Sequence, residues 1–254
     1  FNGDYTFGAR SAPGQIEVNA DYVWNRYANN LTGLANNQAD EYDSPRLGAT
    51  FLWRVTPKTQ LFVEGQYADF DYKWSESKLD SENTSAYVGA RWQATAKTSG
   101  SVQLGRQEKR FDDGEKPDED ANSWQAELTW NPETYSTVTL STANTLEEGS
   151  ESAIDVTREN ATEQTTYSIS WDYAWSSRVS TNLGYSLLEE DYLGGSRGQR
   201  GELEDTDTVT ASVSYSFRRW LDFGFETLFK NNDSSEDASD YDRNTYFLTA
   251  TLSL

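Results

Sequence analysis

The feature of this sequence that most constrains its fold is an alternation of apolar and polar residues, sustained over about ten residues at a time. In residues 208–217, TVTASVSYSF, every even position is Thr or Ser, and every odd position is Val, Ala, Tyr or Phe. Side chains alternate between the two faces of a β-strand, so this pattern predicts a strand with one apolar and one polar face. The apolar face could pack in a soluble core or face a lipid bilayer.

The same alternation recurs along the whole chain. Segments of roughly ten residues match the length that a tilted strand needs to cross a membrane. About twelve segments fit this pattern: Gln15–Tyr27, Arg46–Val55, Gln60–Trp74, Thr84–Ala94, Ser101–Phe111, Ser123–Trp130, Ser136–Thr145, Thr165–Trp175, Val179–Leu188, Thr208–Phe217, Leu221–Lys230 and Asn244–Leu254.

The connections between these segments alternate in length. Tight turns are predicted near Pro57, Lys97, Pro132, Ser177 and Arg219, while the intervening connections are long, polar and acidic. Short periplasmic turns and long extracellular loops are typical of an outer-membrane barrel. A β-propeller has a similar repeat of about forty residues but needs four short strands in each, and here each repeat holds two long strands.

The tryptophans favour the membrane over a soluble β-sandwich, because aromatic side chains concentrate at the headgroup level on both sides of a bilayer. A sandwich core gives no reason to place one Trp at each tight turn. The girdle predicted at the turns is Trp53, Trp92, Trp130, Trp175 and Trp220, and that at the opposite strand ends includes Trp24, Trp74 and Trp124.

We therefore predict an all-β protein, a closed antiparallel transmembrane β-barrel that forms one domain over residues 1–254. About twelve strands are expected and fourteen remain possible, because residues 1–14 form either an N-terminal arm or a further strand. Only 35% of the residues are hydrophobic and the mean hydropathy is -0.81. A barrel with a hydrated interior accounts for this polarity, because it needs no large apolar core.

The polar face of the strands supplies candidate residues for the lumen. Charged rings set selectivity in many pores, so these groups could guide a polar solute, although cross-strand ion pairs in a hydrated lumen would also explain them. The candidates for the lumen and its selectivity are Glu17, Asp21, Arg54, Glu64, Arg91, Glu127, Asp172, Asp222, Glu226 and Lys230.

Composition excludes several other functions. The chain has no Cys and no His, so thiolate and imidazole metal sites and every His-assisted nucleophile are ruled out, and we predict no catalytic residues and no enzyme activity. A net charge of -21 argues against a nucleic-acid partner. The acidic loops are interpreted as solvated. No cofactor or metal site is assigned, and the alternative for these loops is divalent cations that bridge them to lipopolysaccharide.

The C-terminal end resembles the closing hairpin of a β-barrel porin family associated with exopolysaccharide and capsule export operons. The residues that carry this resemblance are Arg219, Trp220, Asp240, Tyr241, Arg243 and Asn244. FLWRVTPKTQLFVEGQYADFDY and GARWQATAKTSGSVQLGRQEKRFDD extend it to most of the chain from about Arg46 onward. One departure is that the chain ends in Leu254, whereas many outer-membrane proteins end in Phe.

The resemblance implies a Gram-negative outer-membrane location and a passage or docking site for a secreted polysaccharide. The partners it implies are outer-membrane lipid, lipopolysaccharide and periplasmic export proteins. Two alternatives remain open. One is a non-specific diffusion porin, and the other is a structural or surface barrel that presents its acidic loops.

Overall fold

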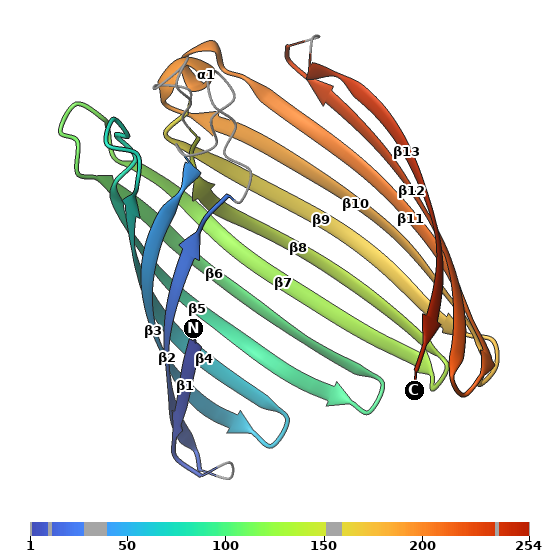
Figure 1. Cartoon of the computed structure of the whole chain (residues 1–254). Coiled ribbons are helices and arrows are strands. Elements are labelled where there is room, and N and C mark those ends of the chain that lie inside the picture. Colours follow the sequence, from blue (N-terminus) through green and yellow to red (C-terminus); the bar gives the residue numbers. More distant parts are fainter. Residues whose placement is uncertain (1, 10–11, 28–39, 151–158, 237–238, 254) are drawn as a thin grey trace.

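A computed structural model describes residues 2–9, 12–27, 40–150, 159–236 and 239–253. They form one antiparallel sheet of 13 strands, in which each strand pairs with its neighbours in sequence. The sheet is strongly curved (Figure 1). The strands are β1 Asn2–Phe7, β2 Gly14–Asn25, β3 Tyr42–Thr56, β4 Thr59–Tyr72, β5 Ser81–Thr95, β6 Thr98–Phe111, β7 Glu119–Glu133, β8 Ser136–Glu148, β9 Ala161–Ala174, β10 Val179–Leu193, β11 Leu203–Arg218, β12 Leu221–Ser234 and β13 Tyr241–Leu252.

The twelve predicted segments correspond to β2–β13, and the described residues form one strand more than the expected number of about twelve. Asn2–Phe7 forms a further strand, β1, whose register with β2 runs from Asn2–Asp21 to Phe7–Ile16. Several strands also extend beyond their predicted ends next to the long connections, as β10 does to Leu193. Backbone pairing continues there after the apolar alternation has ended, because strand pairing needs only extended backbone and not an apolar face.

The sheet has two edges, and the predicted closed barrel is therefore not what the described residues form. Every described register joins consecutive strands, so β1 and β13 are the edge strands. Neighbouring antiparallel strands reverse direction, so the first and the thirteenth strand run the same way. A direct antiparallel seam between β1 and β13 is excluded by this geometry.

The two ends of the strands carry different connections, as the sequence predicts. At one end, here called the turn end, two-residue turns join four hairpins, at Pro57–Lys58, Ala96–Lys97, Thr134–Tyr135 and Arg219–Trp220. At the other, the loop end, longer connections include residues 73–80, 112–118 and 194–202. A short helix, α1 (Gly195–Arg200), lies in the last of these and was not predicted. Among the described residues, no helix has both the length and the apolar character to cross a membrane.

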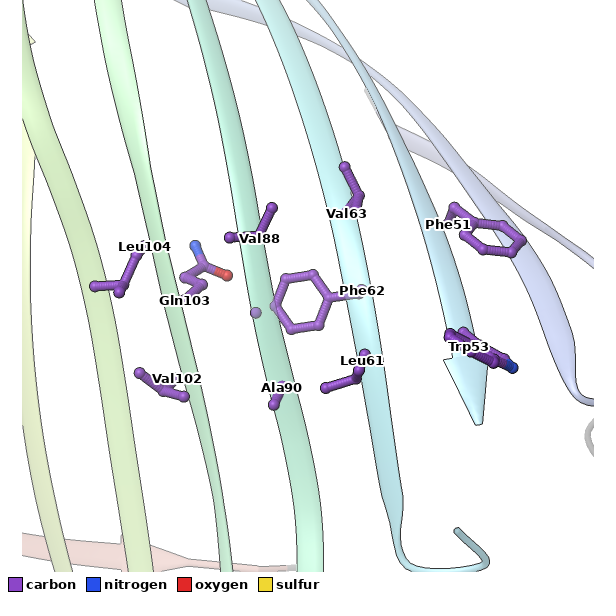
Figure 2. Close-up of a pocket in the computed structure, with 11 residues that line it drawn as sticks. Phe51, Trp53, Leu61, Phe62, Val63, Val88, Ala90, Val102, Gln103 and Leu104 are labelled. Carbon is purple, nitrogen blue, oxygen red and sulfur yellow. The ribbon is translucent and has the colours of Figure 1, made fainter. Parts of the chain in front are cut away.

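One face of the sheet is apolar and exposed. Phe51, Val63, Val88 and Leu104 are successive cross-strand partners on β3–β6, and a second such row contains Trp53, Leu61, Ala90 and Val102. Figure 2 shows these side chains around an apolar depression of about 470 Å³. The odd positions of residues 208–217 lie on the same face, where Val213 is 43% exposed. A soluble protein rarely exposes so large a continuous apolar surface.

The opposite face is concave, and glycine–aromatic pairs lie on it on β4–β6. Phe62 is the cross-strand partner of Gly89, and Tyr87 is the cross-strand partner of Gly105. Each ring occupies space above its glycine, because a Cβ at Gly89 would overlap Phe62 and lie 2.5 Å from the carbonyl oxygen of Val102. Glycine therefore lets both rings lie flat against the adjacent strand.

Arginine substitutions on the two faces of β11 should have different effects. Val213→Arg places a charge on the apolar face, where we expect lipid, and should destabilise the folded protein by about 2–4 kcal/mol. Ser212→Arg is the control, because Ser212 faces the concave side and pairs with Glu226. The fraction folded in lipid vesicles, measured from heat-dependent gel mobility, checks this. Equal losses for both variants would contradict the assignment of the faces.

A side chain at Gly89 should also destabilise the sheet. Gly89→Ala forces the ring of Phe62 and the β6 backbone apart, and overpacking of this kind costs about 1–3 kcal/mol. Gly65→Ala on β4 is the matched control, since a Cβ there has no neighbour within 4 Å. Urea unfolding in vesicles measures both free energies, and an unchanged midpoint for Gly89→Ala would show that this close approach is not required.

Candidate functional site: the concave face

Side chains on the concave face reach one another across several strands. Arg91 on β5 lies 3.8 Å from the carboxylate of Glu17 on β2, although these strands are three positions apart in the sheet. In a flat sheet this separation would be roughly 14 Å, at about 4.8 Å per strand. The hydroxyl groups of Tyr87 on β5 and Ser123 on β7 likewise lie 3.2 Å apart. These contacts identify this face as the inside of the curve.

A polar cavity of about 820 Å³ lies against this face. Its lining comes from β2–β9 and includes residues 145–148 at the loop end of β8. Carboxylate, amide and guanidinium groups dominate the lining, so the cavity offers both hydrogen-bond donors and acceptors to a polar solute. The polar residues around it include Asn19, Asp21, Arg46, Glu64, Gln107 and Gln125.

The ten predicted lumen residues all lie on this face by strand register. Arg54, Arg91, Glu127 and Lys230 belong to one continuous row of cross-strand partners that runs from β3 to β12. Of the ten, Asp21 and Glu64 line the cavity. Glu17 and Arg91 pair with each other, and Asp172 accepts a hydrogen bond from Asn182 at 2.9 Å. Asp222 and Glu226 lie on β12, beyond the strands that line the cavity.

The concave face is less uniformly polar than the sequence alternation predicts. Leu52 is 1% exposed and Phe62 is buried, and both point to the inside of the curve. The guanidinium carbon of Arg91 lies 5.3 Å from the centre of the Phe62 ring, so the ring supports a charged group of the lumen. At the loop end, Phe70, Tyr72, Leu79 and Phe111 form an apolar cluster. The prediction that the interior needs no apolar core therefore holds only for part of the sheet.

Sequence reasoning missed the most buried charge of this face. The side chain of Lys109 on β6 is 0% exposed, and its ammonium group lies 4.8 Å from the ring centre of Phe70. Its position in the strand could have shown where it points, because Gln103 and Gln107 share its parity. Arg46 and Gln107 were also absent from the predicted set. No sequence pattern indicated which strands carry the groups that contact Lys109, Arg46 and Gln107.

The predicted tryptophan girdles lie at the ends of the strands. Trp53 and Trp130 are exposed on the apolar face, each four residues before a turn. Trp175 and Trp220 are in turns, and Trp92 precedes another. Trp24 and Trp124 lie toward the loop end of β2 and β7, and Trp74 follows β4. Trp124 donates a hydrogen bond from Nε1 to the hydroxyl of Thr142 at 3.2 Å.

The described residues contain no group of three or more Asp, Glu, His or Cys side chains arranged to hold a metal ion. The polar lining of the cavity can provide hydrogen bonding and electrostatic guidance to a solute. The prediction of divalent cations at the loops concerns bridges to lipid rather than a site within this chain. It stays a prediction.

Two solved structures with a similar architecture are described as metal transporters. The apoprotein form of the FrpB iron transporter from Neisseria meningitidis superposes with a TM-score of 0.60 at 12% identity, over 92% of this chain and 44% of that one. The copper transporter OprC superposes with a TM-score of 0.57 at 10% identity, over 93% of this chain and 46% of that one. This chain thus spans less than half the length of these structures. At such identities the likeness concerns the fold alone.

A comparison with curated protein sequences finds no match. A family model, in contrast, matches the chain over its whole length, residues 1–254, and its description is "Putative beta-barrel porin 2". The antiparallel sheet, the exposed apolar face and the polar concave face agree with this description. The chain belongs to this β-barrel porin family.

Proposed function

We propose that this protein forms a channel in the bacterial outer membrane and that a polysaccharide or another polar solute passes through its hydrated lumen. The observation that carries the proposal is the polar cavity of about 820 Å³ inside a sheet whose other face is apolar and exposed. Lipid would cover the apolar face. The concave face would then enclose water and the solute.

The channel requires a closed barrel, because an open sheet edge in lipid leaves backbone N–H and C=O groups without hydrogen-bond partners. With β1 and β13 running in the same direction, two seams are possible. One is a parallel pairing of these strands, and the other inserts an odd number of further strands between them. We propose that the sheet is closed in the membrane by one of these seams.

The lining of the cavity supports a carbohydrate as the solute. Asn19, Gln107 and Gln125 provide amide groups that donate and accept hydrogen bonds, as sugar hydroxyl groups require. Tyr42 also lines the cavity, and its partly exposed ring can cover the apolar face of a sugar. Periplasmic export proteins would deliver such a polymer, and lipopolysaccharide, bridged by divalent cations to the acidic loops, would surround the barrel.

Single-channel recording in planar bilayers tests this function. If a sugar polymer enters the lumen, neutral oligosaccharides should produce brief, concentration-dependent blockades of the ionic current. A diffusion porin is the second candidate, since the description of the family that matches this chain names porins and no solute. It would give a steady current that oligosaccharides leave unchanged. No current in either case would indicate a structural barrel.

The carboxylates of the lumen should make the pore cation-selective. Glu64, Glu127, Asp172 and Glu226 carry negative charge on the concave face, and low-dielectric walls strengthen their field. Replacing the four with Gln or Asn should move the reversal potential in a salt gradient toward zero, most clearly at low salt. Neutralising Glu108 and Asp120, which lie on the opposite face, is the control. An anion-selective unmodified pore would contradict this prediction.

A further inference from the structure

At the loop end the sheet separates between β7 and β8, and the end of β8 lies over the concave face. β7 begins at Glu119, but its described register with β8 ends at the pair Trp124–Asn144. β8 nevertheless continues to Glu148 and stays paired with β9 as far as Glu148–Ala161. β8 thus separates from β7 beyond Asn144, while β9 stays paired with β10 as far as Ala161–Leu193. We call residues 145–148 and 161–164 the inward hairpin.

The contacts of the inward hairpin place it over the concave face. The backbone N–H of Leu146 donates to Oε1 of Gln107 on β6 at 2.7 Å, and the hydroxyl of Tyr72 on β4 donates to Oε2 of Glu148 at 3.0 Å. In a flat sheet, β4 and β8 would be roughly 19 Å apart. Leu146 packs with Ala121 of β7 and with Ala161, so its side chain faces the wall. The hairpin therefore crosses the mouth of the lumen.

A buried cation anchors the first leg of this hairpin. Nζ of Lys109 lies 2.5 Å from Oε1 of Glu148, and the rings of Phe70 and Phe111 exclude water from its side chain. An ammonium group in such surroundings needs its counter-ion, because an unpaired charge loses hydration without compensation. Any movement of Glu148 away from the wall would leave Lys109 unpaired. The ion pair therefore holds the hairpin in its inward position.

A second buried cation lies next to the other leg. Arg197 of α1 is 7% exposed, pairs with Glu202 at 2.5 Å and Glu204 at 2.7 Å, and lies 4.0 Å from Glu159. Burial alone would lower the pKa of Arg197, but the hydrogen bond with Glu202 and the nearby Glu159 carboxylate raise it above its ordinary value. The adjacent Asn160 donates its backbone N–H to the carbonyl of Leu193 at 2.8 Å. Both legs are thus fixed to neighbouring elements.

We propose that the inward hairpin is the constriction of the pore and that Glu147 determines which solutes pass it. All three of Leu146, Glu147 and Glu148 line the polar cavity, but Leu146 and Glu148 turn toward the wall, whereas Glu147 between them is exposed. A carboxylate at the narrowest point admits neutral or cationic polar solutes and repels small anions. This inference rests on the proposed channel function, and Lys109 acts in it as a positioning residue.

Cysteine labelling in planar bilayers tests the constriction directly, because the chain contains no native Cys. A bulky neutral thiol reagent attached to Glu147→Cys should reduce the current several-fold. Ser214→Cys, on the concave side of β11 and exposed, is the control and should lose little current when labelled. Equal effects at the two positions would overturn the constriction while leaving the channel function intact. A complete absence of current in the unmodified protein would overturn both.

The anchoring role of Lys109 has a separate measurement. Lys109→Met removes the counter-ion of Glu148, so the end of β8 should loosen from the wall while β9 stays paired with β10. The conductance should then rise and larger polyethylene glycols should enter. Arg106→Met is the matched control on the same strand, since Arg106 pairs with Asp120 on the opposite face. Unchanged conductance and size limit in a folded Lys109→Met protein would overturn this role. If that variant does not fold, the labelling of Glu147→Cys still decides whether the hairpin is the constriction.

Discussion

The structure depends on one constraint, which is that every strand satisfies its backbone hydrogen bonds through its neighbours in the sheet. Once the backbone is paired in this way, the side chains need not form a central core, and the two faces can differ completely in polarity. One face carries rows such as Phe51, Val63, Val88 and Leu104, and the other carries amides, carboxylates and cations. The same constraint makes the two edge strands the places where this sheet is incomplete.

Much of the fold could be predicted from the sequence, because strand periodicity is a local property. Alternation located all the strands from β2 to β13, and the turn residues located most hairpins. The short strand β1 remained ambiguous, since Asn2–Phe7 is too brief for periodicity to separate a strand from an arm. Closure was predicted, and the described residues do not form it. It depends on how the edges pair in space, and no residue pattern records that.

The candidate site was predictable only in part, for a related physical reason. Parity placed Glu17, Glu64 and Arg91 on the correct face, because each strand has only two faces. It could not show that Phe62 lies under Arg91 or that Glu148 reaches Lys109. Those contacts join strands that are not neighbours, so they depend on the curvature of the sheet. The glycine–aromatic pairs on β4–β6 accompany that curvature, and they were not recognised as a motif.

The packing of those pairs divides the inner surface into two unlike halves. On β3–β7, the side chains of Leu52, Phe62 and Tyr87 are buried and interlocked, whereas the middle of β10–β12 presents small or polar groups such as Ser212 and Ser214 that stay accessible. The two sides of the concave face therefore differ in accessibility. One side is a densely packed surface whose aromatic rings are covered, and the other presents exposed hydroxyl groups to water. A solute in contact with this face would meet a rigid surface on one side and a hydrated one on the other.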